Sequence, residues 1–213
     1  MSSLEIVSKD ERKMSIKLKG IPLQYSNALR RLCLNGVPIF AIDTVDIIEN
    51  TSVLPDEGLA HRLGLVPLRT DLTRFNEPSK CECQSEVGCS NCKVMLVLDS
   101  GDSDVSKTVF TDELTSEDDS VKSISDKIPI VQLAPGQKVK VECYARLGRG
   151  REHAKWNSSN IATLVETEKE DERILTVEST GALNPEEIIL AGVEELGIRL
   201  GDFKNMIEQL KEE

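Results

Sequence analysis

Apolar and polar residues at the start of the chain follow two different periods. Residues 4–19 alternate as in a β-strand, and residues 38–50 form a β-branched, apolar run that also predicts a strand. Between them a helix is predicted, because the apolar residues recur on one helical stripe formed by Tyr25, Ala28, Leu29, Leu32 and Cys33. We expect Gly36 to end this helix in a left-handed conformation, and Pro38 prevents its continuation.

The middle of the chain, residues 50–157, is polar, rich in turns and predicted to form mostly strands. A short helix opens at Pro55 with acidic residues in its first turn, and its inner face carries Leu59, Ala60 and Leu63. A polar loop at 71–93 follows this helix. The strands after the loop are separated by acidic turns and are expected at 94–98, 107–110 and 139–147.

The last part of the chain predicts a hairpin at 159–168 and 173–180, followed by a long helix. Asn184 is a favourable N-cap, with Pro185 at the first helical position. Apolar residues then recur at spacings of four and three, as in a heptad seam: Ile189, Val193, Leu196, Leu200, Phe203, Ile207 and Leu210. This spacing fits either a stripe packed inside the chain or a surface that packs against a partner's helix.

These patterns indicate an α+β fold. Helices and strands alternate at both ends of the chain, whereas the middle is mostly strand. We therefore expect one discontinuous domain built from 1–49 and 158–213, with a mostly β domain at 50–157 inserted between its two parts.

The charge balance argues against a direct grip on nucleic acid. The 213 residues include 37 acidic and 26 basic side chains, for a formal net charge of −11, whereas phosphate binding needs an excess of lysine and arginine. No run of about 18 apolar residues is present to span a membrane, and the N-terminus lacks the apolar stretch of a signal peptide. We expect a cytoplasmic protein with reduced cysteines.

Four of the six cysteines lie within twelve residues of the polar loop, at Cys81, Cys83, Cys89 and Cys92. Four thiolates at this density are typical of one tetrahedral zinc site, with Arg74, Lys80 and Lys93 near in sequence to offset its negative charge. An iron–sulfur cluster is the alternative, but the C-x2-C-x2-C run of bacterial ferredoxins is absent. Cys33 and Cys143 occupy apolar positions and are expected in the core.

Candidate catalytic residues are few. His61 and His153 are the two histidines, and no motif supplies a nucleophile with a base or a phosphate-binding loop. Asp99, Asp102 and Asp104 fail the spacing of a calcium loop and fit a solvated turn better. The Gly/Arg turn at 148–151 could cradle an anion, although so short a motif is weak evidence. We expect no catalytic residue and no small-molecule substrate.

Four sequence blocks resemble the RNA polymerase alpha-subunit family, which comprises the N-terminal domain of the bacterial alpha subunit and its archaeal and eukaryotic counterparts. They are QYSNALRRLCLNGVPIFAIDTV at 24–45, DEGLAHRLGLVPLRTD at 56–71, ARLGRGREHAKWNSSN at 145–160 and ESTGALNPEEIILAGVEEL at 178–196. The blocks follow the family's order and extend over nearly the whole chain. Within the family the chain is most similar to the archaeal D subunits.

The resemblance implies a dimerisation domain with an inserted β domain, and a non-catalytic role in assembling DNA-directed RNA polymerase. It implies pairing with the small subunit L. The pair, with the small subunits N and P, would form the platform on which the large catalytic subunits assemble. The nucleotidyl-transfer site would lie in a large subunit. In eukaryotic members a zinc site occupies the place of residues 81–92. The alternative is a free-standing, zinc-binding adaptor between proteins, which would need only the cysteine loop and the C-terminal seam.

Overall fold

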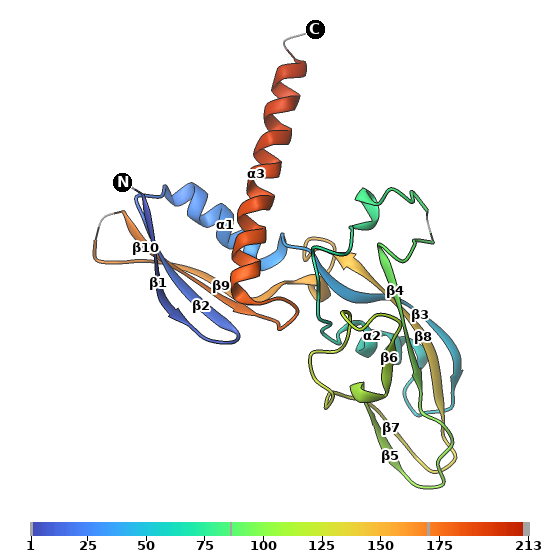
Figure 1. The fold of residues 1–213 in the computed structure, drawn as a ribbon. Coiled ribbons are helices and arrows are strands. Elements are labelled where there is room, and N and C mark those ends of the chain that lie inside the picture. The colour runs from blue at the N-terminus through green and yellow to red at the C-terminus, as the bar shows by residue number, and fades with distance from the viewer. Residues whose placement is uncertain (1, 86, 170, 211–213) are drawn as a thin grey trace. The chain divides into compact units, whose positions relative to one another are not determined.

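The computed structural model describes residues 2–85, 87–169 and 171–210 as a mixed α/β protein (Figure 1). Contacts within the chain divide it into two compact units. Unit 1 combines Met1–Val37 with Arg149–Glu213, and unit 2 is Pro38–Gly148.

Unit 1 contains a four-stranded antiparallel sheet in the order β1-β2-β10-β9. The strands are β1 (Ser3–Lys9), β2 (Lys13–Lys19), β9 (Ser159–Glu166) and β10 (Glu172–Ser179). The alternating segment 4–19 is therefore two strands, because Asp10 turns the chain by accepting the backbone N–H of Lys13 at 2.7 Å. The predicted C-terminal hairpin is confirmed as β9 and β10, and the pairing of β2 with β10 joins the two ends of the chain.

Two helices complete unit 1, α1 (Leu23–Asn35) and α3 (Pro185–Gln209). The predicted start of α3 is confirmed, and the Glu187 carboxylate accepts the backbone N–H of Asn184 at 2.7 Å. The end of α1 is also confirmed, but its predicted mechanism is wrong, because Gly36 has a right-handed φ of −100°. Glycine is required there for space, since an added Cβ would lie 2.9 Å from the backbone Cα of Leu32.

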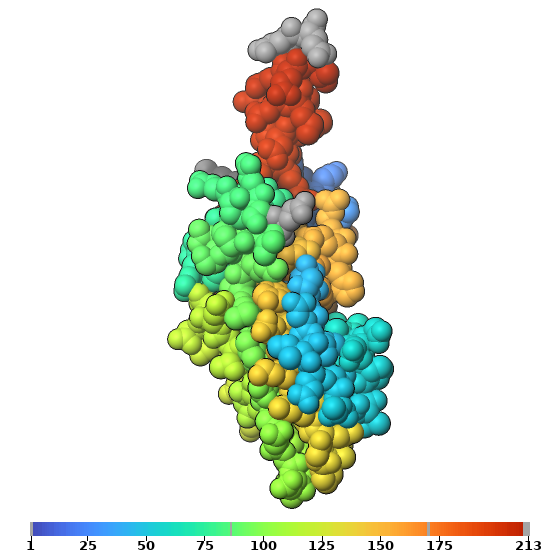
Figure 2. Space-filling model, turned by 90° about the vertical axis from the view of Figure 1, so that its right-hand side faces the viewer, coloured from blue at the N-terminus to red at the C-terminus, as the bar shows by residue number. Residues whose placement is uncertain are grey.

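Unit 2 is organised around a second antiparallel sheet, in the order β3-β8-β4-β6. Its strands are β3 (Ile39–Asn50), β8 (Val139–Gly148), β4 (Lys93–Asp99) and β6 (Leu114–Ser116); β5 (Lys107–Phe110) and β7 (Pro129–Leu133) form a separate two-stranded sheet. The space-filling view shows β3 in blue, β8 in yellow and β4 in green side by side (Figure 2).

The core of unit 2 follows from alternation along these strands. Leu96 and Leu98 of β4 are fully buried, as are Val141 and Cys143 of β8. The predicted short helix is confirmed as α2 (Asp56–Gly64), whose Leu59 and Leu63 are also fully buried, whereas Ala60 is only partly buried. Three short 3-10 helices occupy connections at Pro78–Lys80, Thr111–Glu113 and Ala154–Trp156.

The limits of the two units differ from the boundaries expected at 49/50 and 157/158. Strand β3 belongs to unit 2 because it pairs with β8 from Ile39 to Asn50. The segment after β8 belongs to unit 1, where Ser158 donates a hydrogen bond to the Cys33 carbonyl at 2.8 Å. The apolar pattern marks β3 as a strand but does not say which sheet it joins.

Candidate metal centre and helix surfaces

The four clustered cysteines meet in the loop between α2 and β4. Their sulfur atoms all lie within 4.8 Å of one another. The Sγ–Sγ distances are 3.7 Å for Cys81–Cys89 and 3.8 Å for both Cys83–Cys92 and Cys89–Cys92. The structure thus brings together the four residues that the sequence singled out.

Their spacing suits a tetrahedral ion. With metal–sulfur bonds of about 2.3 Å, the corners of a tetrahedron lie about 3.8 Å apart, which matches these three separations. Four thiolates would also fill the coordination shell and leave no position for a substrate. The donor set therefore fits a structural metal centre.

Tight turns bring the sulfur atoms together. The Cys89 carbonyl accepts the backbone N–H groups of Cys92 at 3.0 Å and Lys93 at 2.9 Å, which closes the second cysteine pair. The first pair ends at Gln84, whose N–H reaches the Cys81 carbonyl at 3.3 Å and whose φ is +47°. Gly88 has a φ of +88°, a conformation that glycine adopts without strain.

The thiols differ in environment. Cys81 and Cys92 are buried, Cys89 is half-buried and Cys83 is exposed. A hydrogen bond from the Ser85 backbone lowers the pKa of Cys83 to about 7, while burial raises the pKa of Cys92 to about 12. Because a metal binds thiolates, loading the site requires release of the protons that these thiols hold.

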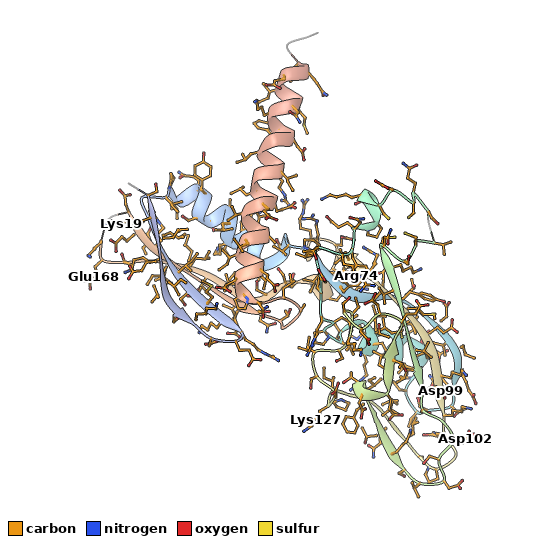
Figure 3. The ribbon with its side chains drawn as sticks, viewed as in Figure 1. Lys19, Arg74, Asp99, Asp102, Lys127 and Glu168 are labelled. Atoms are coloured by element: carbon orange, nitrogen blue, oxygen red, sulfur yellow. The ribbon has the colours of Figure 1, made fainter. Side chains whose placement is uncertain are left out.

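Arg74, Lys80 and Lys93, which were expected to offset the charge of the metal site, contact other side chains. Arg74, labelled in Figure 3, forms an ion pair with Asp118. Lys80 pairs with Glu77 at 2.9 Å, and Lys93 lies over the Tyr144 ring at 4.5 Å from its centroid. Arg74 and Lys93 thus tie the two ends of the loop to neighbouring elements, whereas the Lys80–Glu77 pair lies within the loop.

Cys33 and Cys143 are buried, as predicted. Burial raises the pKa of each thiol to about 12. They lie in different units and outside the cluster of four cysteines.

The acidic turn after β4 is held by lysines. Asp99 pairs with Lys140 at 3.1 Å and Asp102 with Lys138 at 3.6 Å, and both aspartates are labelled in Figure 3. The Gly101 backbone N–H, which donates to Asp99 at 3.0 Å, lowers the pKa of that carboxyl group. These contacts support the interpretation of a solvated turn.

The residues predicted to contact a partner differ in exposure and fall into three groups in unit 1. Leu29, Leu32 and Ile189 are buried within the chain, where α1 and α3 pack together. The exposed group has exposed fractions of 40% or more, and it comprises Tyr25, Val193, Leu200, Phe203, Ile207 and Leu210; Ala28 and Leu196 are intermediate. Partner contact remains a prediction for the whole set.

Close packing of α1 against α3 depends on Gly192. An added Cβ at this position would lie 3.1 Å from Leu29 Cδ1 and 3.3 Å from Cys33 Sγ. The first turns of α3 are thereby buried on unit 1. Beyond Leu196 the same seam stays exposed, with Phe203 at 60% and Leu210 at 72%. Contiguous apolar exposure is typical of interaction surfaces, so partner contact along this part of α3 stays a prediction.

Comparison with known families matches residues 34–182 to the RNA polymerase Rpb3/RpoA insert domain. This match covers more than half of the chain. The chain belongs to the Rpb3/RpoA family.

Relatives of this Rpb3/RpoA chain include three archaeal proteins named DNA-directed RNA polymerase subunit Rpo3. Identity is 41% over 159 residues with that of Methanosphaera stadtmanae, 41% over 164 residues with that of Pyrobaculum arsenaticum, and 38% over 161 residues with that of Archaeoglobus fulgidus. The matches cover 74%, 76% and 76% of this chain and 58%, 62% and 60% of the relatives. The chain thus spans less than two thirds of these relatives' length.

Among the described residues of this Rpb3/RpoA family member, no helix is long and apolar enough to cross a membrane.

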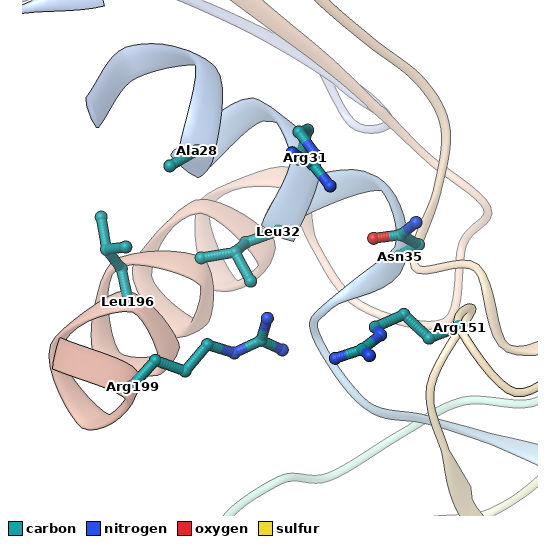
Figure 4. A pocket seen from close by; sticks show the side chains of 7 residues that line it. All are labelled: Ala28, Arg31, Leu32, Asn35, Arg151, Leu196 and Arg199. Carbon is teal, nitrogen blue, oxygen red and sulfur yellow. The ribbon is translucent and has the colours of Figure 1, made fainter. Parts of the chain in front are cut away.

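Sequence reasoning missed one charged site in unit 1. A cavity of about 410 Å³ is lined by the apolar side chains of Ala28, Leu32 and Leu196 and by Arg31, Arg151 and Arg199 (Figure 4). The Gly/Arg turn at 148–151 gave a weak hint of an anion site. No sequence signal connects it with α1 and α3, because the three segments lie far apart in the chain.

Proposed function

We propose that this chain is the D-type assembly subunit of an archaeal DNA-directed RNA polymerase. Membership of the Rpb3/RpoA family and the Rpo3 relatives support this proposal. The alternative of a free-standing adaptor is not favoured, because the family match extends far beyond the cysteine loop and the C-terminal seam. Under this proposal the protein works in the cytoplasm.

One structural observation carries the assembly role. The second half of α3 presents Leu200, Phe203 and Ile207 to solvent at exposed fractions of 51%, 60% and 40%. Fully burying an exposed side chain of this size contributes about 1.5–3 kcal/mol, and burial of these half-exposed side chains in a helix–helix interface contributes part of that amount each. In the proposed complex this surface pairs with a small alpha-like subunit, L, and unit 1 acts as a discontinuous dimerisation domain.

The pair then serves as a platform. Subunits N and P and the large catalytic subunits assemble on it, and nucleotidyl transfer takes place in a large subunit. In this arrangement the chain binds proteins and supplies no catalytic group. Its net charge of −11 is in keeping with binding to proteins and not to a phosphate backbone.

The test is purification of the tagged chain from its source cell with identification of the retained proteins. Large polymerase subunits and a small alpha-like subunit should be retained by the wild type. Leu200→Asp plus Phe203→Asp should abolish that retention, because the change places charge in an apolar seam. Gly201→Asp plus Asn205→Asp adds the same charge to the opposite side of α3 and should retain the partners. Retention by the seam variant would contradict the proposal.

We also propose that Cys81, Cys83, Cys89 and Cys92 hold one structural zinc ion. The four sulfur atoms and their separations support this assignment. Metal analysis of protein purified without added metal should give one zinc per chain. Cys89→Ser plus Cys92→Ser should lose the ion, while Ser90→Ala in the same turn should keep it. Iron with visible absorbance, or four freely titrating thiols, would refute the zinc assignment.

A further inference from the structure

The cavity of unit 1 has a charged wall and an apolar floor. Arg31 comes from α1, Arg199 from α3 and Arg151 from the turn that follows β8. Figure 4 shows the side chains of Arg151 and Arg199 reaching toward each other, with Leu32 and Leu196 nearby. Its volume of about 410 Å³ is large enough to admit a side chain with its neighbours.

Positive charge at this cavity is incompletely balanced. The Glu195 carboxylate forms ion pairs with Arg199 Nε at 2.9 Å and with Arg149 Nη1 at 2.8 Å. Its side chain is only 12% exposed. Neither Arg31 nor Arg151 forms an ion pair with any carboxylate in the described parts of the chain. Two guanidinium groups are therefore available for an external anion, and guanidinium groups pair with carboxylates in a bidentate geometry.

Surrounding features favour a protein over a nucleic acid as the source of that anion. The chain carries a net charge of −11, which repels a phosphate backbone. The floor of Ala28, Leu32 and Leu196 favours apolar atoms beside the charge. Along α3, Leu196 is followed on the same side by the exposed Leu200 and Phe203, at helical spacings of four and three. The apolar floor of the cavity therefore adjoins the exposed apolar surface of the helix.

We propose that this cavity receives an acidic side chain, flanked by apolar residues, from a partner protein. Arg31 and Arg151 bind the carboxylate, and Arg199, held by Glu195, lines the opposite wall. That the partner is a protein of the polymerase rests on the proposed function. The cavity then adds a charge-specific contact to the apolar surface of α3, and this contact selects among partners.

Photo-cross-linking in the source cell tests the proposal. A p-benzoylphenylalanine at Asp202 lies three residues from Arg199, on the same side of α3, and leaves all three arginines in place. We expect a cross-linked peptide of another protein that contains an aspartate or glutamate beside apolar residues. Cross-links to nucleic acid, or to a second copy of this chain, would overturn the proposal.

The second part of the cross-linking test reverses the charge of the two arginines. Arg31→Glu plus Arg151→Glu should lower the cross-link yield at least about tenfold, whereas the exposed control pair Arg12→Glu plus Arg69→Glu should leave it unchanged. Arg31→Gln plus Arg151→Gln removes the charge without reversing it and should give an intermediate loss of yield. This variant serves as a control in case the charge-reversed variant misfolds. Replacing the partner's acidic residue by arginine should restore the yield of the reversed variant. A yield that is insensitive to these charges would sink the proposal.

The two proposals fail separately. If polymerase subunits co-purify with the chain but the cross-link ignores the arginines, only the cavity assignment fails. If the charge-sensitive cross-link forms with a protein outside the polymerase, the assembly role fails and the acidic-segment assignment stands.

Discussion

At the scale of single residues, the six cysteines divide into two chemical kinds. Four converge at sulfur separations that suit a tetrahedral metal. Cys33 and Cys143 are enclosed by apolar neighbours, which raises the pKa of each to about 12. Spacing along the chain distinguished the two kinds, because ligands of one ion cluster in sequence whereas core cysteines follow the apolar period.

The buried thiol of Cys143 gives unfolding a pH dependence of definite sign. Its pKa is raised to about 12 in the folded protein from an ordinary value of 9.0, so only the unfolded thiol ionises between these values. Its contribution to the free energy of unfolding is complete below the lower value and is lost as the pH rises through the upper one.

Urea titrations at about pH 8 and about pH 10.5 measure this effect. The loss of stability between the two should be smaller in Cys143→Ala than in the wild type, by up to about 1.4 kcal/mol per pH unit. Val141→Ala, which opens a cavity on the same strand without removing a thiol, should keep the wild-type loss. Equal losses in all three proteins would contradict the assignment.

Gly88 should influence metal affinity at the proposed zinc site. Gly88→Ala would strain a residue at φ +88° and bring its Cβ within 3.1 Å of Lys93 Cβ. We expect a cost of about 1–2 kcal/mol and metal affinity about tenfold lower in chelator competition. Gly136→Ala, at φ +74° with open space around it, should leave metal affinity unchanged. Unaltered affinity in Gly88→Ala would argue against this role.

At the scale of elements, the apolar seam of α3 is buried at one end and exposed at the other. Ile188 and Ile189 are buried on unit 1, whereas Phe203 and Leu210 are exposed. The heptad pattern predicted the helix and its apolar stripe, but it could not locate the change from buried to exposed. That change occurs where α3 extends beyond the elements that cover its first turns.

Two glycines of α3 should respond differently to the same substitution. Gly192→Leu would force α3 away from α1, because Leu29 and Cys33 occupy the space, and we expect a loss of about 1–3 kcal/mol. Gly197→Leu has nothing within 4 Å and should stabilise the helix by about 1 kcal/mol. Thermal unfolding monitored by circular dichroism measures both. Similar midpoints for the two variants would show that α1 and α3 are not tightly packed.

At the scale of the whole molecule, each unit has its own core. Unit 2 encloses a continuous apolar cluster that includes Phe40, Phe75 and Leu96. Phe75 packs edge-on against Phe40 with centroids 4.9 Å apart, and it anchors the start of the cysteine loop. The four-cysteine cluster lies within unit 2, and none of its residues comes from unit 1.

Metal removal should therefore act locally. After chelation we expect faster amide exchange at residues 71–93, because that loop buries few apolar side chains to offset its ordering entropy. Exchange in α1 and in the first turns of α3 should be unchanged. Hydrogen exchange followed by mass spectrometry measures both regions. Loss of protection throughout the chain would show that the metal supports the whole fold.

Sequence alone determined the local features of this protein. Periodicity located α1, α2 and α3 and most strands, and Asn184 with Pro185 marked the start of α3. The cysteine spacing identified the candidate ligands. These features depend on residues close together in the chain, so a pattern of apolar positions, caps and ligands suffices to reveal them.

Only the tertiary structure decided which distant segments meet. It assigned β3 to the sheet of unit 2, because backbone hydrogen bonding to β8 does not depend on the identity of the side chains. It required glycine at Gly36 for space and not for a left-handed turn. It also gathered Arg31, Arg151 and Arg199 around one cavity. The strand pairing and the cavity join segments that lie far apart in the chain, so no local pattern encodes them.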